Sequence, residues 1–224
     1  MNKIDLIQLE HQTKIGDVCG HIEPNVTEDT LFLLDGEIIG FYLKDISKHS
    51  EKLSNFINIA NTELRSKKVP KSLMKRSSGL HSSENEVLQY STIIGSVPPK
   101  PHMRRPYPTI SSVHNVPTAK TFIKAMLLAC KESEELIKKY APNVFEKQLK
   151  LIEDNVPKKY SFGRLFTSSI SNYNISAPFH RDNGNIQGCV NVIIAKKKDA
   201  IGGNTTVPDY GATVDSCDNS MLVY

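Results

Sequence analysis

A histidine and an aspartate two residues apart, His180 and Asp182, are the pair in this sequence best suited to bind a metal ion. On an extended strand, side chains two residues apart point to the same face, so the imidazole and the carboxylate would lie side by side. They would supply two of the three ligands of a 2-His-1-carboxylate iron site. No histidine follows His180 before the sequence ends at Tyr224. The pair therefore predicts an iron site that this chain fills only in part.

The same string, His180-Arg181-Asp182, also occurs in the catalytic loop of protein kinases. That loop requires an asparagine five residues after the aspartate, where this chain has Gln187. The sequence also has neither the glycine-rich phosphate loop nor the Asp-Phe-Gly motif of a kinase. A kinase is therefore excluded.

The elements that must position this pair are predicted to be short strands, because the residue pattern after Pro157 is typical of strands joined by turns. Apolar or β-branched runs alternate with turn signals such as Asn183-Gly184 and Gly202-Gly203, a spacing typical of an antiparallel sandwich or barrel. A jelly roll is one way to close such a sheet. The predicted strands are Leu165 to Tyr173, Ala177 to Asp182, Cys189 to Ala195, Thr205 to Val207, Ala212 to Val214 and Met221 to Tyr224.

The sequence before Pro157 predicts a hairpin followed by helices. Asp35-Gly36 separates two apolar runs in residues 31–43, and this dipeptide favours a type I′ turn. From about Ser47, apolar residues recur with helical spacing. Two further helices are predicted, one capped by Thr118 and running toward Tyr140 before Pro142, the other over Val144 to Ile152.

Two stretches are predicted to be surface loops, residues 65–85 and the proline-rich residues 97–108. The net charge of the chain is +4, and residues 161–224 carry as many acidic as basic side chains, so the positive surplus lies upstream. A cluster of bases without an acid between them could neutralise phosphates, although a solvated loop explains it equally well. The cluster consists of Arg65, Lys67, Lys68, Lys71, Lys75 and Arg76.

The rest of the composition is that of an ordinary globular protein. No apolar run approaches the roughly 18 residues of a membrane span, and no secretory signal is apparent, so we expect no membrane partner and a cytoplasmic location. Four widely spaced cysteines predict buried free thiols. We divide the chain into an N-terminal α+β elaboration, residues 1–157, and a core, residues 158–224. The other histidines have no ligand spacing and are expected to be structural: His11, His21, His49, His81, His102 and His114.

Two local strings in the core resemble one enzyme family. His180-Arg181-Asp182 is followed three residues later by Asn185, and residues 202–211 read Gly-Gly-Asn-Thr-Thr-Val-Pro-Asp-Tyr-Gly. Together they resemble the Fe(II)- and 2-oxoglutarate-dependent dioxygenases, and in particular the TET/JBP branch, which has phage members. That branch often has His-Arg-Asp as its metal motif, and many of these oxygenases carry a Gly-Gly hairpin and a "PxYG" turn after it. The resemblance covers about residues 160–224.

The resemblance implies a fold, a reaction and a role for each matching residue. The fold would be α+β, with a double-stranded β-helix (jelly roll) as its core. His180 and Asp182 would bind Fe(II), Tyr173 would contact 2-oxoglutarate, and Asn185 would hydrogen-bond a flipped base. The substrate would be the 5-methyl group of thymine or 5-methylcytosine in DNA, so DNA is the expected partner.

The resemblance also implies a distal iron-binding histidine and an arginine that pairs with 2-oxoglutarate. Both would follow the strand Met221 to Tyr224 and thus lie beyond the last residue given. The chain is therefore expected to be completed by a missing C-terminal segment or a second polypeptide. Two alternatives stay open: the same chemistry on a protein or small molecule, and a truncated or split module that binds nucleic acid without catalysis.

Overall fold

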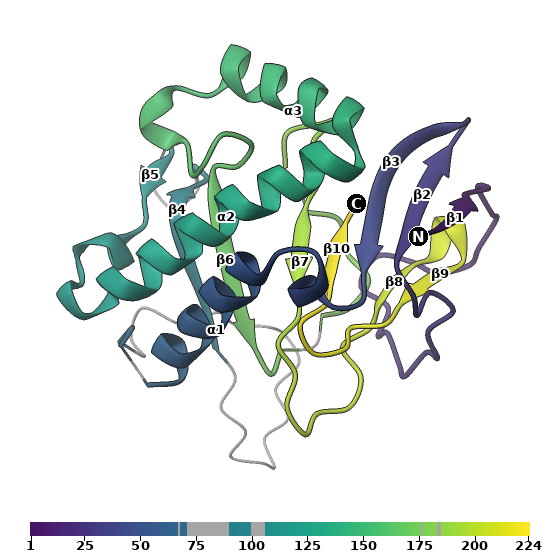
Figure 1. The fold of residues 1–224 in the computed structure, drawn as a ribbon, viewed down its shortest axis with the longest axis horizontal. Helices are drawn as coiled ribbons and strands as arrows, with labels where there is room; N and C mark the ends of the chain where they lie inside the picture. Colours follow the sequence, from purple (N-terminus) through teal and green to yellow (C-terminus); the bar gives the residue numbers. More distant parts are fainter. Residues whose placement is uncertain (67, 71–89, 100–105, 176, 183–184) are drawn as a thin grey trace. The chain divides into compact units, whose positions relative to one another are not determined.

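The computed structural model describes residues 1–66, 68–70, 90–99, 106–175, 177–182 and 185–224. They form a mixed α+β fold of three α-helices and several small sheets, as predicted, and none of the described sheets closes into a barrel (Figure 1). The double-stranded β-helix stays a prediction. Most of the predicted basic cluster and the Asn183-Gly184 turn lie outside the described residues.

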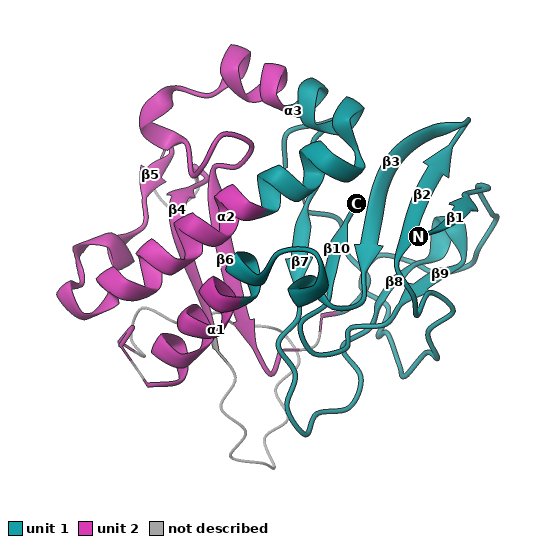
Figure 2. Ribbon diagram, viewed as in Figure 1, with its two compact units in different colours: residues 1–54, 133–148, 178–224 teal, residues 55–132, 149–177 magenta. Residues whose placement is uncertain are grey.

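The chain divides into two compact units, and each unit draws on separate stretches of sequence (Figure 2). Unit 1 comprises residues 1–54, 133–148 and 178–224, and unit 2 comprises residues 55–132 and 149–177. These are spatial groupings of the chain. They do not test the predicted division near residue 157, which stays a prediction.

Unit 1 is built on a five-stranded sheet in the order β1-β2-β3-β10-β7. β1 is parallel to β2, and every other neighbouring pair is antiparallel. β10 lies between β3 and β7, with Met221 opposite both Leu43 and Ile194, so strands from both ends of the sequence share the sheet. The strands are β1 (Asn2–Asp5), β2 (Thr30–Leu34), β3 (Glu37–Leu43), β7 (Val192–Ile194) and β10 (Met221–Val223).

The predicted hairpin is confirmed by β2 and β3. Its turn residues Asp35 and Gly36 have φ angles of 50° and 78°, the positive values that a type I′ turn requires. Further along β3, Gly40 lies where β10 passes closest, because a Cβ atom there would overlap the carbonyl oxygen of Val223. Glycine at this position therefore lets the two strands approach.

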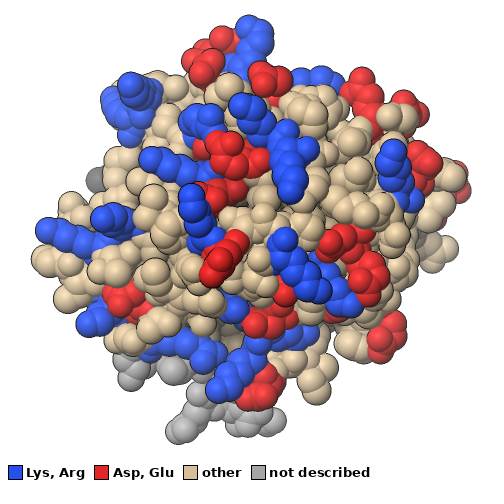
Figure 3. All heavy atoms as spheres, viewed as in Figure 1, with Lys and Arg blue, Asp and Glu red and all other residues tan. Residues whose placement is uncertain are grey.

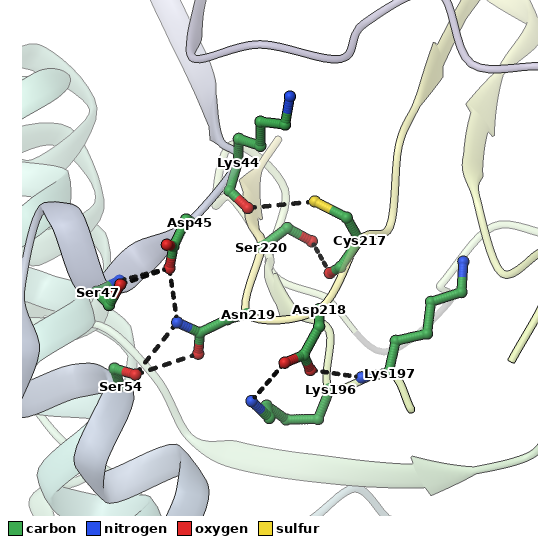
Figure 4. Close-up of polar contacts among 10 residues, drawn as sticks. All are labelled: Lys44, Asp45, Ser47, Ser54, Lys196, Lys197, Cys217, Asp218, Asn219 and Ser220. Carbon is green, nitrogen blue, oxygen red and sulfur yellow. Dashed lines mark hydrogen bonds and ion pairs between the residues drawn. The ribbon is translucent and has the colours of Figure 1, made fainter. Parts of the chain in front are cut away.

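A polar network fixes the loop that leads into β10 (Figure 4). The Asn219 side-chain amide donates to Asp45 Oδ1 at 2.8 Å and to Ser54 Oγ at 3.1 Å. Burial would raise the pKa of Asp45, but hydrogen bonds from Ser47 and Asn219 outweigh it and hold the pKa below its ordinary value. On the other side of Asn219, the Cys217 thiol donates to the Lys44 carbonyl oxygen at 3.2 Å. The loop is thus tied to the segment that follows β3.

A second hairpin of unit 1 matches the predicted strands residue for residue. β8 (Thr205–Val207) pairs with β9 (Ala212–Val214), and the turn between them is the 3-10 helix η7 (Pro208–Tyr210), followed by Gly211 at φ 58°. Val214 also bridges to Val26. It belongs to a buried apolar cluster of unit 1, formed by Val26, Phe32, Tyr42, Val214 and Leu222.

Unit 2 contains a three-stranded antiparallel sheet in the order β5-β4-β6, formed by β5 (Thr109–Ile110), β4 (Tyr90–Val97) and β6 (Ser168–Tyr173). Gly95 in β4 has φ 83°, and its N–H donates to Nε2 of His114 in the 3-10 helix η4 (Ser112–Asn115) at 2.8 Å. The buried core of this unit is Ala60, Leu64, Val69, Ile94, Val113, Ala119, Phe122, Ala125 and Phe162.

The three helices are α1 (Glu51–Arg65), α2 (Lys120–Tyr140) and α3 (Pro142–Asn155), so all three helix predictions are confirmed. The expected apolar stripe of α1 is buried at Leu53, Ile57, Ala60 and Leu64. The predicted cap is wrong. Thr118 lies in the 3-10 helix η5 (Pro117–Ala119), and its hydroxyl donates to the carbonyl oxygen of Lys68 at 2.6 Å instead of to the first turn of α2.

Five of the six strands predicted after Pro157 are present, as β6 to β10. The sixth is wrong, because the described residues 177–182 form no strand. Pro178 has no N–H to donate to a neighbouring strand, which weakens any ladder at this point. Within the described part of the chain, no helix is both long enough and apolar enough to cross a membrane.

Candidate metal centre

His180 and Asp182 lie side by side even though their segment is not a strand. Nε2 of His180 is 3.5 Å from Oδ1 of Asp182, and about half of each side chain is exposed, 49% and 48%. The other ring nitrogen, Nδ1, is 2.7 Å from the carbonyl oxygen of Pro178. A carbonyl oxygen only accepts, so Nδ1 carries a proton, and in the neutral form of the ring the lone pair is on Nε2. That lone pair is on the nitrogen nearer to the carboxylate.

The separation of the two donor atoms suits a single divalent cation. Two metal–ligand bonds of about 2.1 Å can span at most about 4.2 Å, which exceeds the 3.5 Å between Nε2 and Oδ1. Metal-bound histidines usually donate their second N–H to a carbonyl or carboxylate oxygen, as Nδ1 of His180 does. An imidazole nitrogen with a carboxylate oxygen also fits Fe(II). The two residues are therefore suited to hold iron.

The segment that carries the pair is held by a turn near the N-terminus. The N–H of Gly16 donates to the carbonyl oxygen of Phe179 at 2.8 Å, and the N–H of Phe179 donates to that of Asp17 at 2.9 Å. The turn closes on itself, because the Asp17 carboxylate accepts from the N–H of Lys14 at 2.8 Å. Gly16 has φ 97°, which favours glycine at this position. Backbone bonds on either side of Phe179 thus fix the residue directly before His180.

The same N-terminal segment also contacts the β8–β9 hairpin. The N–H of Leu9 donates to the carbonyl oxygen of Asp209 at 2.7 Å, and Nε2 of His11 lies 2.5 Å from the carboxylate of the same residue. Residues 9–17 therefore join the η7 turn to the segment of the metal pair. Nothing in the sequence pattern predicts this role.

Two residues that sequence reasoning did not select complete the surroundings of Asp182. The Asn191 amide nitrogen is 3.5 Å from Asp182 Oδ2. Burial, and then the negative charge of Asp182, raise the pKa of Tyr224, whereas a hydrogen bond from the Asn191 side chain acts in the opposite direction. Both residues could have been identified only from the pairing of β7 with β10, and the sequence alone does not reveal which strands pair.

The segment that leads into β7 is positioned by a buried glutamine. The N–H of Val190 donates to Oε1 of Gln148 at 2.8 Å, and Nε2 of Gln148 lies 3.5 Å from the Val190 carbonyl oxygen. Gln148 is 1% exposed, so these bonds are shielded from water. They fix the backbone directly before Asn191.

The two remaining predicted site residues are placed differently. Asn185 is exposed, and its N–H donates to the carbonyl oxygen of Asp182 at 3.2 Å. Tyr173 belongs to unit 2, where it ends β6 and lies under the guanidinium of Arg65, 5.7 Å from the ring centroid. A base contact by Asn185 and a 2-oxoglutarate contact by Tyr173 stay predictions.

Of the other histidines, His81 and His102 lie outside the described residues. Among the residues that the structure describes, no three His, Cys, Asp or Glu side chains are grouped to share a metal ion. The four cysteines are free, as predicted, but each is partly exposed, so the expectation that they are buried is wrong. His49 links Asp29 to Tyr140 at 2.8 and 2.7 Å, as expected of a structural histidine.

Basic and acidic side chains are interspersed on the face drawn in Figure 3. Several exposed lysines pair with a nearby carboxylate, including Lys44 with Glu28 at 2.6 Å and Lys147 with Glu37 at 3.0 Å. Arg65 and Lys68 are the members of the predicted basic cluster that the structure describes. A phosphate contact by this cluster stays a prediction.

Comparison with protein-family models, with curated proteins and with solved structures found no match to this chain.

Proposed function

We propose that the chain is an Fe(II)- and 2-oxoglutarate-dependent dioxygenase that hydroxylates the 5-methyl group of thymine or 5-methylcytosine in DNA. The observation that supports it best is the pairing of His180 Nε2 with Asp182 Oδ1 at 3.5 Å, with the imidazole held by the Pro178 carbonyl oxygen. The proposed fold is a double-stranded β-helix, with which the antiparallel pairs β7–β10 and β8–β9 are compatible.

In this proposal iron and 2-oxoglutarate supply the oxidising chemistry. One oxygen atom of O₂ enters the methyl C–H bond, the other enters succinate, and CO₂ leaves, so that atoms and electrons balance. The protein holds the iron through His180 and Asp182 and orients the reacting groups. Asn185, exposed and three residues after Asp182, would hydrogen-bond the edge of the flipped base. Tyr173 would contact the 2-oxoglutarate.

Half-exposed ligands suit a large substrate, because a polymer can reach the iron only if the site opens to the surface. Both His180 and Asp182 meet this condition. Arg65 and Lys68 are exposed and would contribute to phosphate binding as part of the predicted basic cluster.

The direct test is mass spectrometry of nucleosides from DNA incubated with protein, Fe(II), 2-oxoglutarate and O₂. We expect a 5-hydroxymethyl pyrimidine and an equal amount of succinate, and neither product with His180→Ala. The matched control is His21→Ala, because His21 is an exposed histidine that pairs with Glu23.

Two outcomes would contradict the DNA hypothesis. If a peptide is hydroxylated while the DNA stays unmodified, the proposed oxygenase chemistry is supported but the proposed substrate is wrong. DNA affinity that falls steeply with salt, without succinate formation, would instead indicate a nucleic-acid-binding module.

A further inference from the structure

β1 is an edge strand of the five-stranded sheet of unit 1 (Figure 1). The N–H groups of Asn2 and Leu6 donate to carbonyl oxygens on the β2 side, at 2.8 and 2.7 Å. Backbone groups of successive residues in a strand point in alternate directions, so those of Lys3 and Asp5 point away from β2. No strand of the described residues pairs with that side of β1. The edge therefore offers backbone donors and acceptors to a further strand.

The two faces of β1 differ in their chemistry. The side chain of Ile4 packs against the buried apolar cluster of unit 1. Side chains alternate between the faces of a strand, so Lys3 and Asp5 are on the other face, and both are exposed. Directly before and after β1 and Leu6, the apolar residues Met1 and Ile7 are 48% and 72% exposed. The edge thus combines an apolar face with two opposite charges, two residues apart.

The order of these charges determines which strand fits the edge. Two copies of β1 that pair antiparallel about a two-fold axis exchange backbone bonds between their outward-pointing residues, Lys3 and Asp5. If Lys3 lay opposite Lys3, or Asp5 opposite Asp5, like charges would face each other and weaken the pairing. With Lys3 opposite Asp5, both facing pairs have opposite charges. Ile4 then lies opposite Ile4 on the apolar face, so the edge is complementary to itself.

We propose that the chain forms a homodimer through β1, in which Lys3 of each copy lies opposite Asp5 of the other. The two sheets join into one continuous sheet by strand addition. Each Lys3–Asp5 pair exchanges both backbone bonds, and the two Ile4 side chains meet in a non-hydrogen-bonded pair, where side chains come closest. The same register brings Met1 toward Ile7 of the second copy and covers apolar surface that is exposed in the single chain. The strand is short, so the dimer is weak and depends on concentration.

Sedimentation velocity of the untagged full chain over a concentration series measures this dimer. We expect the mass to rise from 25.0 kDa toward twice that value as the concentration increases. Lys3→Glu makes acidic side chains face each other across the axis, and Asp5→Lys makes basic side chains do so. Each variant should therefore dimerise at least about fivefold more weakly at low salt. Both side chains are exposed, and circular dichroism checks that each variant is folded.

A mixture of the two variants tests the register itself. In a dimer of one Lys3→Glu chain with one Asp5→Lys chain, every facing pair again has opposite charges. An equimolar mixture should therefore recover the affinity of the unmodified chain. The matched control is Lys52→Glu, which makes the same charge change at an exposed position of α1 and should leave dimerisation unchanged.

Three outcomes would overturn the β1 dimer. A monomer at every concentration up to about 1 mM would do so, and would leave the edge to a strand of a different protein. A dimer that both variants retain would place the contact elsewhere. Variants that stay monomeric when mixed would contradict the register. The dimer does not depend on the proposed iron site, and neither variant changes His180 or Asp182, so these outcomes leave that site untouched.

Discussion

Two groups of its own segment flank the His180 ring, one as a hydrogen-bond acceptor and one as a neighbouring carboxylate. The Pro178 carbonyl oxygen accepts from Nδ1 at 2.7 Å, and the Asp182 carboxylate lies 3.5 Å from Nε2. The first contact sets which nitrogen keeps its proton, and the second places an oxygen donor beside the other nitrogen. The spacing of one residue between histidine and aspartate therefore brings two metal ligands together without the help of a strand.

Asp182→Asn tests the charge of this pair while keeping the size of the side chain. An amide oxygen is a weaker ligand for a divalent cation, so Fe(II) affinity should fall by at least about tenfold. Competition with a coloured chelator measures the affinity. Asp199→Asn removes an exposed carboxylate elsewhere in residues 158–224 and should leave the Fe(II) affinity unchanged. An equal loss in both variants would show a general charge effect.

We expect the stability of the protein to depend on pH through His114. Burial lowers the pKa of His114 below its ordinary value of 6.5, and its Nε2 accepts from the Gly95 N–H, which a protonated ring cannot do. The unfolded chain therefore binds the proton more readily than the folded one. The contribution of His114 is present above pH 6.5 and is lost as the pH falls through the folded-state pKa.

Denaturant unfolding at a series of pH values between about 7.5 and 5 measures this contribution. As the pH is lowered, the free energy of unfolding of the unmodified protein should decrease. It should decrease less in His114→Gln, because glutamine keeps a hydrogen-bond acceptor but does not take up a proton. Parallel curves for the two proteins would assign the pH dependence to other groups.

The elements divide into those that the sequence predicts and those that depend on distant partners. The Asp35-Gly36 turn, the apolar stripe of α1 and the Pro208–Tyr210 turn follow from local residue types, and each is found. The order of the strands does not follow from local residue types, because nothing in the sequence near Met221 indicates that it pairs with Leu43. For the same reason the approach of the Asn191 side chain to Asp182 could not be predicted.

The failed strand at residues 177–182 has a similar cause. Alternation of residue types predicts an extended chain, but a strand also needs a continuous partner. Here Phe179 bonds to Gly16 and Asp17 of a turn, a partner provided by a stretch of sequence with no strand signal. The His180 and Asp182 side chains therefore lie together as expected, but on a segment held by a turn and not on a strand. A metal ion between them stays a prediction.

Asn219 is the residue on which the placement of β10 should depend most. It combines a φ angle of 66°, which asparagine tolerates better than most residues, with amide bonds to Asp45 and Ser54. Asn219→Ala loses the bonds and strains the backbone, so the free energy of unfolding should fall by roughly 1–3 kcal/mol or more. Asn219→Gly relieves the strain and should cost less. Equal losses in urea unfolding would mean that the φ angle contributes nothing.

At the scale of the whole molecule, each of the three helices contributes residues to both compact units. α2, for example, passes from unit 2 to unit 1 between Glu132 and Ser133. A continuous helix propagates its hydrogen bonds along its length, so loss of helix in one unit disfavours it in the other. The units should therefore unfold together.

Lys131→Gly tests this coupling at an exposed position in the interior of α2. Glycine costs about 1 kcal/mol relative to alanine in a helix, so Lys131→Ala is the matched control. Native-state hydrogen exchange should show slowly exchanging amides of β3 and of β4 losing protection by the same amount. Loss confined to one of the two strands would show that the units open independently.

The position of β10 also constrains the order in which the protein acquires its structure during synthesis. β2 and β3 leave the ribosome early, whereas β10, the strand that separates β3 from β7, is made about 180 residues later. Contacts between such distant residues form slowly, and an unpaired strand edge invites wrong partners in the meantime. Until β10 has been synthesised, the hairpin has an unpaired edge at β3. A nascent chain should therefore depend on chaperones until β10 has paired with that edge.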